Sequence, residues 1–184
     1  MKVKVNKVTI RIARAETLTQ SVDAIVHVTD PNLSLNTILS EKGGLALAQA
    51  CQEIGWCRVG SAVITTAGNL PFQKIIHAVA PRWGEGHERA SLSSVTLKCL
   101  QLAEENGIRS LALPAISTGT LGYPVEGCAR VMLEEIINFT FEDLRYLRTI
   151  VLCLDSRLTY DVFAQEFSRL VRSLQVSGEG KVKV

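Results

Sequence analysis

A loop of small residues, Ser117-Thr118-Gly119-Thr120-Leu121-Gly122, carries the strongest chemical signal in this sequence. The apolar run at 111–116 that precedes it is typical of a buried strand, and a helical pattern begins after it at Pro124. The first N–H groups of a helix have no partner inside the helix, and glycine lets a ligand approach the backbone. The arrangement therefore predicts a site for a phosphate-bearing small molecule, with a plain strand–helix turn as the alternative.

Histidines and cysteines are the other side chains that could do chemistry. His77 lies among apolar residues in a strand pattern, which favours a buried structural histidine over a catalytic one, because the sequence supplies no acid or nucleophile beside it. His27 lies close to a strand end and could line a pocket, although a structural role is favoured; with Asp30 it gives only two metal ligands.

The five cysteines form no C-x-x-C pair, which predicts reduced thiols rather than a disulfide framework or a zinc site. A reactive thiol at Cys51 or Cys57, beside an exposed-looking Gly-Trp turn, is the remaining alternative.

The composition limits the class of protein. A chain of 184 residues with 47% hydrophobic and 21% charged residues is typical of one globular domain with a substantial core. A net charge of +2 does not by itself predict nucleic-acid binding, and 5% aromatic residues give little material for a base-stacking surface. Without a membrane-length apolar stretch or a signal-peptide pattern, we expect an intracellular protein of the nucleus or cytoplasm, away from the membrane.

Strand and helix patterns alternate along most of the chain. After one or two strands within 3–12, helix patterns with apolar residues at i, i+3 and i+4 alternate with short apolar strands, which predicts an α/β domain with a mostly parallel sheet. We expect one domain over 1–176 and a loose tail over 177–184. The predicted strands lie at 24–28, 61–66, 74–80, 111–116 and 149–154, and the predicted helices at 45–51, 91–103 (with Ser91 as N-cap), 125–137 and 162–171.

Five segments follow one another along the chain: Val22-Asp-Ala-Ile-Val26, Lys42-Gly-Gly-Leu-Ala46, residues 60–71, Ile75-Ile-His-Ala-Val-Ala-Pro81 and Leu113-Pro-Ala-Ile-Ser-Thr-Gly119. Together, in this order, they resemble a macro domain, an ADP-ribose-binding fold. The likeness runs from about residue 8 to about residue 172. It implies a three-layer α/β/α sandwich with a mixed, mostly parallel central sheet. The residues of these segments are most similar to those of macro domains of vertebrate ADP-ribosyltransferase (PARP-type) proteins, and the macro histone domain is a looser relative.

The resemblance implies a ligand site with ADP-ribose as its ligand and no cofactor or metal. Glu16 and Asp155 would lie near the adenine, Asp30 near the distal ribose, and the first glycine loop along that ribose and the diphosphate. The small-residue loop would wrap the phosphates with its backbone N–H groups. The two loops contribute Gly43, Gly44, Leu45 and Ala46, and Ser117, Thr118, Gly119, Thr120 and Leu121.

Three departures from the family pattern bear on activity. The family's Asn-Ala-Ala-Asn is here His27-Val-Thr-Asp30, and a carboxylate cannot donate a hydrogen bond as the amide of the second Asn does. Lys42 replaces a glycine, so we expect that position to lose strain-free access to positive φ. Leu121 and Leu154 stand where aromatic residues are frequent, which removes stacking worth about 0.5–1.5 kcal/mol per pair.

The resemblance implies, first, a non-catalytic reader that recognises ADP-ribose or mono-ADP-ribosylated protein. The first alternative is an interaction module for protein or nucleic acid that has lost ADP-ribose binding. The second alternative is an ADP-ribosyl hydrolase, ranked last because Asp30 replaces the asparagine associated with hydrolysis. No catalytic residue is assigned.

Overall fold

An eight-stranded mixed sheet forms the centre of the computed structural model, which describes residues 1–184. The strand order is β4-β5-β3-β6-β7-β2-β1-β8, and β2, β7, β6, β3 and β5 run parallel to their neighbours within this set. β4, β1 and β8 pair antiparallel at the two edges. The strands are β1 (Lys2–Val5), β2 (Val8–Arg14), β3 (Ala24–Thr29), β4 (Ala62–Thr66), β5 (Lys74–Val79), β6 (Ser110–Pro114), β7 (Thr149–Leu154) and β8 (Val182–Lys183).

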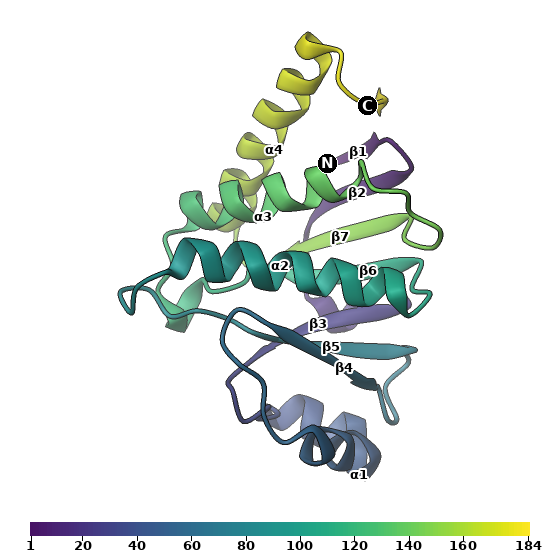
Figure 1. Cartoon of the computed structure of the whole chain (residues 1–184), viewed down its shortest axis with the longest axis vertical. Coiled ribbons are helices and arrows are strands. Elements are labelled where there is room, and N and C mark those ends of the chain that lie inside the picture. The colour runs from purple at the N-terminus through teal and green to yellow at the C-terminus, as the bar shows by residue number, and fades with distance from the viewer.

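Helices cover both faces of this sheet, unequally. α2 (Glu88–Glu105), α3 (Val125–Phe139) and α4 (Arg157–Ser177) pack on one face, and α1 (Thr37–Ile54) packs on the other, near β4 and β5 (Figure 1). Two 3-10 turns, η1 (Thr17–Thr19) and η2 (Gly119–Leu121), follow the ends of β2 and β6. The result is the predicted three-layer α/β/α sandwich, and both faces of the central strands are buried, which explains their almost continuous apolar runs.

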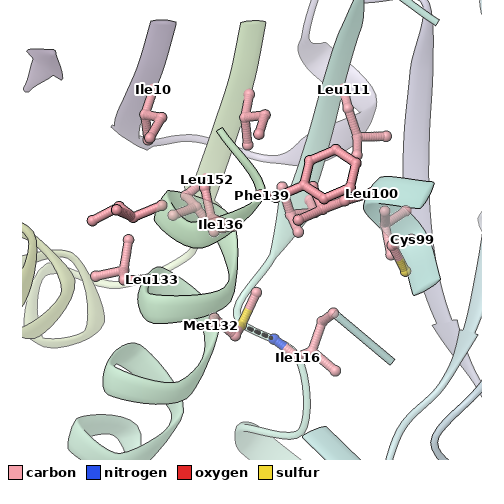
Figure 2. Packing of buried hydrophobic residues seen from close by; sticks show 14 of the residues in the cluster. Ile10, Cys99, Leu100, Leu111, Ile116, Met132, Leu133, Ile136, Phe139 and Leu152 are labelled. Carbon is pink, nitrogen blue, oxygen red and sulfur yellow. Dashed lines mark hydrogen bonds between the residues drawn. The ribbon is translucent and has the colours of Figure 1, made fainter. Parts of the chain in front are cut away.

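The larger core lies between the sheet and helices α2, α3 and α4. Figure 2 shows Leu133 and Ile136 of α3 packed toward Ile10 and Leu152 of neighbouring strands, with Met132 against Ile116. All of these side chains are fully buried, as the spacing of apolar residues in 125–137 predicts. The five cysteines are buried and free, and burial raises the pKa of Cys51 and Cys57 above the ordinary value.

Three sequence expectations differ from the structure. The second helix begins at Glu88 with His87 in the N-cap position, so the prediction of Ser91 as N-cap is wrong; the turn at Gly84–Gly86 delivers the chain one turn earlier. The first helix begins at Thr37, where the Asn36 side chain accepts a hydrogen bond from the Leu39 N–H, and it kinks at Gly44. The segment 177–184, expected to be loose, contains β8, which pairs with β1.

None of the helices combines the length and apolar character that a membrane crossing needs.

Candidate functional site

The parallel strands bring four loops to one edge of the sheet. β6 lies between β3 and β7, and β2 lies beyond β7, so the carboxyl ends of all four strands point the same way. Open α/β sheets bind ligands at this edge. The loop that follows β6 therefore lies in the middle, with Asp30 after β3 on one side and Asp155 after β7 and Glu16 after β2 on the other.

Two sulfur atoms of α3 hold the root of the central loop. The Ile116 N–H donates to Met132 Sδ at 3.3 Å, and the Cys128 thiol donates to the Ile116 carbonyl at 2.8 Å (Figure 2 shows the first of these). Burial raises the pKa of the Cys128 thiol, so the thiol stays protonated and keeps its donor role. Both backbone polar groups of Ile116 are thus satisfied, and the loop starts from a fixed point.

The backbone from 117 to 121 has its N–H donors free, while three of its five carbonyl groups accept hydrogen bonds. None of its five N–H groups donates a hydrogen bond within the protein, whereas the Ser117 and Leu121 carbonyls accept from the N–H groups of Tyr123 and Trp83, each at 2.9 Å. The Gly119 carbonyl accepts from the Gly122 N–H at 3.0 Å. Successive N–H groups fixed in this way form an anion-binding concavity. We call residues 117–121 the phosphate cradle.

Two residues give the cradle its shape. Ser117 has φ +68, a left-handed conformation that a non-glycine residue adopts at a cost, and its buried hydroxyl has no hydrogen-bond partner. Gly119 has φ +71, and a Cβ placed there would meet nothing within 4 Å. The space beside Gly119 is therefore open to a ligand.

A small cavity of about 250 Å³ lies on the β7 and β2 side of the cradle. It brings together three of the predicted site residues, Glu16, Thr118 and Asp155, with buried Leu154 as part of its floor. The sequence did not predict the remaining lining residues as part of the site. Their signal was position alone, because each lies at or just after the carboxyl end of β2, β6 or β7: Ala15, Thr17, Leu18, Pro114, Ala115 and Cys153.

Asp30 lies outside that cavity, exposed, after β3. Its Oδ1 accepts from the Asn32 N–H at 2.9 Å and from the Ser34 N–H at 3.3 Å. Hydrogen bonding from the Ser34 side chain first, and then from these two backbone N–H groups, lowers the pKa of Asp30, so the carboxyl group is ionised at neutral pH. The carboxylate thus already serves a local turn at the position where the resemblance expects a ribose ligand.

The predicted segment Gly43-Gly44-Leu45-Ala46 also lies outside the cavity and forms the kink of α1. Gly44 has φ +73, and the Gly43 carbonyl accepts from the Asn69 N–H at 3.0 Å. Leu45 is 72% exposed. Lys42 lies in the helical turn before the kink and does not adopt positive φ. The glycine replaced at Lys42 is therefore not needed for positive φ in this fold, because only the Gly44 position turns the chain.

The two buried histidines form one hydrogen-bonded chain beneath α1. The Thr65 hydroxyl donates to the Thr66 carbonyl at 2.9 Å, so its oxygen must accept the Nε2–H of His77 at 2.8 Å. His77 Nδ1 then accepts from His27 Nδ1–H at 3.0 Å. Burial lowers the pKa of His27 to about 4 and that of His77 to about 3, so both are neutral at pH 7. The structural interpretation of His77 is confirmed, and Nε2–H cannot activate the Cys51 thiol 3.7 Å away.

The sequence matches the family model for the macro domain over residues 17–132. The chain belongs to the macro-domain family. This match covers β3 to the middle of α3, including the phosphate cradle and the kink of α1.

Relatives of this macro domain include named enzymes and ligand complexes. An O-acetyl-ADP-ribose deacetylase of Enterobacter sp. (strain 638) is 37% identical over 156 residues, which cover 79% of this chain and 87% of the relative. The solved Oceanobacillus iheyensis macrodomain with ADP superimposes with a TM-score of 0.87 at 25% identity and covers 94% of this chain and 97% of its own. A mutant of that macrodomain with ADPR gives a TM-score of 0.86 at 25% identity, covering 94% of this chain and 98% of its own. These relatives are bacterial, so they do not confirm the finer likeness to vertebrate ADP-ribosyltransferase-type or macro histone domains.

Proposed function

We propose that this macro domain binds ADP-ribose, with the diphosphate held by the phosphate cradle. The observation that carries the proposal is the run of five backbone N–H groups, 117–121, that have no partner in the protein. Unpaired donors in a fixed loop are costly unless water or a ligand satisfies them, and a diphosphate supplies acceptors at the right place. The solved relatives with ADP and with ADPR support this choice of ligand.

The remaining predicted residues divide the ligand between two sides of the cradle. Glu16 and Asp155 border the small cavity, where a carboxylate can accept from the amino group of an adenine, and Leu154 gives an apolar surface beneath the ring. The distal ribose falls on the other side, near Asp30 and the segment Gly43 to Ala46. An ionised Asp30 accepts from a ribose hydroxyl but repels the diphosphate, so we expect weaker binding than an asparagine would give.

We further propose that the domain acts as a reader of ADP-ribose or mono-ADP-ribosylated protein and does not turn its ligand over. Asp30, which replaces the family's asparagine, has its carboxylate engaged by the turn at 32–34. His27 and His77 are both buried, and His27 donates its Nδ1–H to His77. The likeness of the motifs to vertebrate ADP-ribosyltransferase-type domains is part of this proposal, as is an intracellular location.

Removal of the acetyl group from O-acetyl-ADP-ribose is the second candidate function. The observation that favours it is the 37% identity to a named O-acetyl-ADP-ribose deacetylase over 79% of this chain. Incubation with O-acetyl-ADP-ribose separates the two: the reader proposal predicts no acetate release above the uncatalysed rate. Release that Asp30→Ala abolishes would establish the enzyme instead.

Replacement of Gly119 tests the ligand site. Gly119→Glu places a carboxylate in the open space of the cradle, where repulsion of a phosphate about 4 Å away costs about 4 kcal/mol. Titration calorimetry with ADP-ribose should therefore show at least a 100-fold loss of affinity.

Gly178→Glu is the matched control for that variant. Gly178 ends α4 with φ +72, and a Cβ placed there would also meet nothing within 4 Å, so backbone strain and charge change are the same at a distant position. We expect wild-type affinity for the control. The proposal would be contradicted if the Gly119→Glu variant bound ADP-ribose as tightly as the wild type. It would also be contradicted if calorimetry of the wild type showed no heat of binding at millimolar ADP-ribose.

A further inference from the structure

The positive charge of this chain is concentrated at its two ends. Residues 1–14 and 181–184 contain seven Lys and Arg residues and no Asp or Glu, whereas the remaining 166 residues contain 13 cations and 18 carboxylates. The fold brings these ends together, because β8 pairs with β1, and both termini lie beside the same edge of the sheet (Figure 1). A net charge of +2 therefore hides a strongly basic region.

Strand register places the cations of this region opposite one another. Val3 and Val5 of β1 point into the core, so Lys2 and Lys4 lie on the outer face. Lys2 faces Arg11 of β2, and Lys4 faces Lys183 of β8. Like charges directly opposite on a sheet destabilise it, so these pairs have an energetic cost that a bound anion would remove.

A groove of about 790 Å³ runs beside these strands. Its charged lining contains five cations and one carboxylate, Glu142, and its single hydrophobic lining residue is Phe141, which is 50% exposed. We call the cations of the outer face and the groove together the cationic edge: Lys2, Lys4, Lys7, Arg11, Arg148, Lys181 and Lys183. Among them only Lys7 forms an ion pair, with Asp143 at 3.7 Å.

The walls of the groove are held in place by Asn6. Its side-chain oxygen accepts from the Lys181 N–H at 3.0 Å, and its amide nitrogen donates to Thr140 Oγ1 at 3.0 Å. The Asn6 N–H donates to the Lys181 carbonyl at 2.7 Å, so one residue joins the β1–β2 turn, the C-terminal segment and the end of α3. The groove is therefore built by tertiary contacts and not by a free tail.

We propose that the cationic edge binds the phosphate backbone of single-stranded nucleic acid, with Phe141 as a stacking surface for a base. Lysine and arginine contacts to phosphate give sequence-independent binding, and an exposed aromatic ring adds stacking that an unpaired base can use. One apolar side chain in the groove is too little for membrane insertion, which favours a polyanion over a lipid surface.

This site is independent of the proposed ADP-ribose function. Arg148 precedes the amino end of β7, and Lys7 precedes β2, whereas the phosphate cradle lies at the carboxyl ends of the parallel strands. Strands of six or seven residues separate the groove from the carboxyl ends by about 20 Å, with Lys2 and Arg11 level with the middle of β2. Both ligands can therefore bind at once.

Fluorescence anisotropy with a labelled oligothymidine tests the proposal on the full chain. We expect binding that weakens steeply between about 50 and 200 mM salt. Lys4→Glu with Lys183→Glu should lower affinity at least tenfold and make the slope of log K against log salt shallower by about 1.4, because two phosphate contacts are lost. Phe141→Ala should lower affinity at least about fivefold with an unchanged slope.

Controls separate this effect from misfolding and from net charge. Arg58→Glu with Arg130→Glu makes the same charge change at exposed positions elsewhere and should lower affinity less than threefold. Lys4→Glu alone creates an opposite-charge pair with Lys183, so the strand pair is kept while binding still falls. Each cationic-edge variant should retain wild-type affinity for ADP-ribose.

Three results would overturn the proposal. The first is no anisotropy change for the wild type at low salt. The second is an equal loss in the Arg58 and Arg130 control. The third is binding to phosphatidylserine vesicles without binding to the oligonucleotide, which would assign the cationic edge to a membrane surface.

Discussion

A single hydroxyl group sets the protonation pattern of the buried histidine pair. Thr65 donates to the Thr66 carbonyl and so forces His77 to carry its proton on Nε2, which in turn makes His27 the donor between the two rings. Every buried ring nitrogen in the link from Thr65 to His27 then has a partner. The pair is therefore a satisfied polar element of the α1 face and not a free acid or base.

Thr65→Val should destabilise the protein. The variant keeps the shape of the side chain but leaves His77 Nε2–H buried without an acceptor, so we expect a loss of about 1–3 kcal/mol in the free energy of unfolding. Urea denaturation measures this loss. Thr96→Val is the control: the buried Thr96 hydroxyl donates to the Leu92 carbonyl within α2, and its removal should cost less than about 1 kcal/mol. Equal losses in the two variants would contradict the assigned chain.

At the scale of secondary-structure elements, Asp23 ties three strands together at the end of the sheet opposite the phosphate cradle. Its Oδ2 accepts from the N–H groups of Arg109 and Ser110 at 3.0 and 3.3 Å, where β6 begins. Its Oδ1 accepts from the Gln73 side chain just before β5, and its own N–H donates to the Ser110 hydroxyl. One carboxylate before β3 thus positions the start of the strand that carries the phosphate cradle.

Asp23→Ala should lower the free energy of unfolding by about 2 kcal/mol, because hydrogen bonds to an ionised acceptor are among the stronger ones and two backbone donors lose their partner. Thermal and urea denaturation provide the measurement. Asp161→Ala removes a carboxylate from an exposed pair with Arg157 at 3.8 Å and should change stability by less than about 0.5 kcal/mol. If Asp23→Ala behaved like this control, the proposed clamp would be wrong.

For the whole molecule, the buried histidines make stability depend on pH. Both pKa values fall from an ordinary 6.5 in the unfolded chain to about 4 for His27 and about 3 for His77 in the native state. The unfolded state therefore binds more protons below pH 6.5, and the stability present at neutral pH is lost as the pH falls toward 4. Each histidine should cost about 2 kcal/mol at pH 5, with the two titrations coupled.

Urea unfolding at pH 7 and pH 5 measures this loss, and NMR titration of the imidazole signals identifies its source. His87 is exposed, so His87→Gln should leave the pH dependence unchanged. Titration of the His27 and His77 rings near pH 6.5, or equal stability at the two pH values, would show that the pair is not held neutral by burial.

Some features of the candidate site could be predicted from residue patterns, and others could not. The cradle at 117–121 could be predicted because a strand, a small-residue loop and a helix start are consecutive in the chain. The place of Glu16 and Asp155 beside it was available only through resemblance, since β2, β6 and β7 are far apart in sequence. That Asp30 serves its own turn, and that Ser117 adopts positive φ with a buried hydroxyl, depends on side-chain packing that no local pattern encodes.

The sequence by itself determined the order of strands and helices, because apolar periods of two and of 3.6 residues are local properties of the chain. It also determined the one loop with the character of a phosphate site. Only the tertiary structure decided the strand order, the hydrogen bond between His27 and His77, and the pairing of Lys4 with Lys183, residues 179 positions apart. Those contacts follow from which faces the whole chain can bury together, and a local pattern cannot report on a partner that distant.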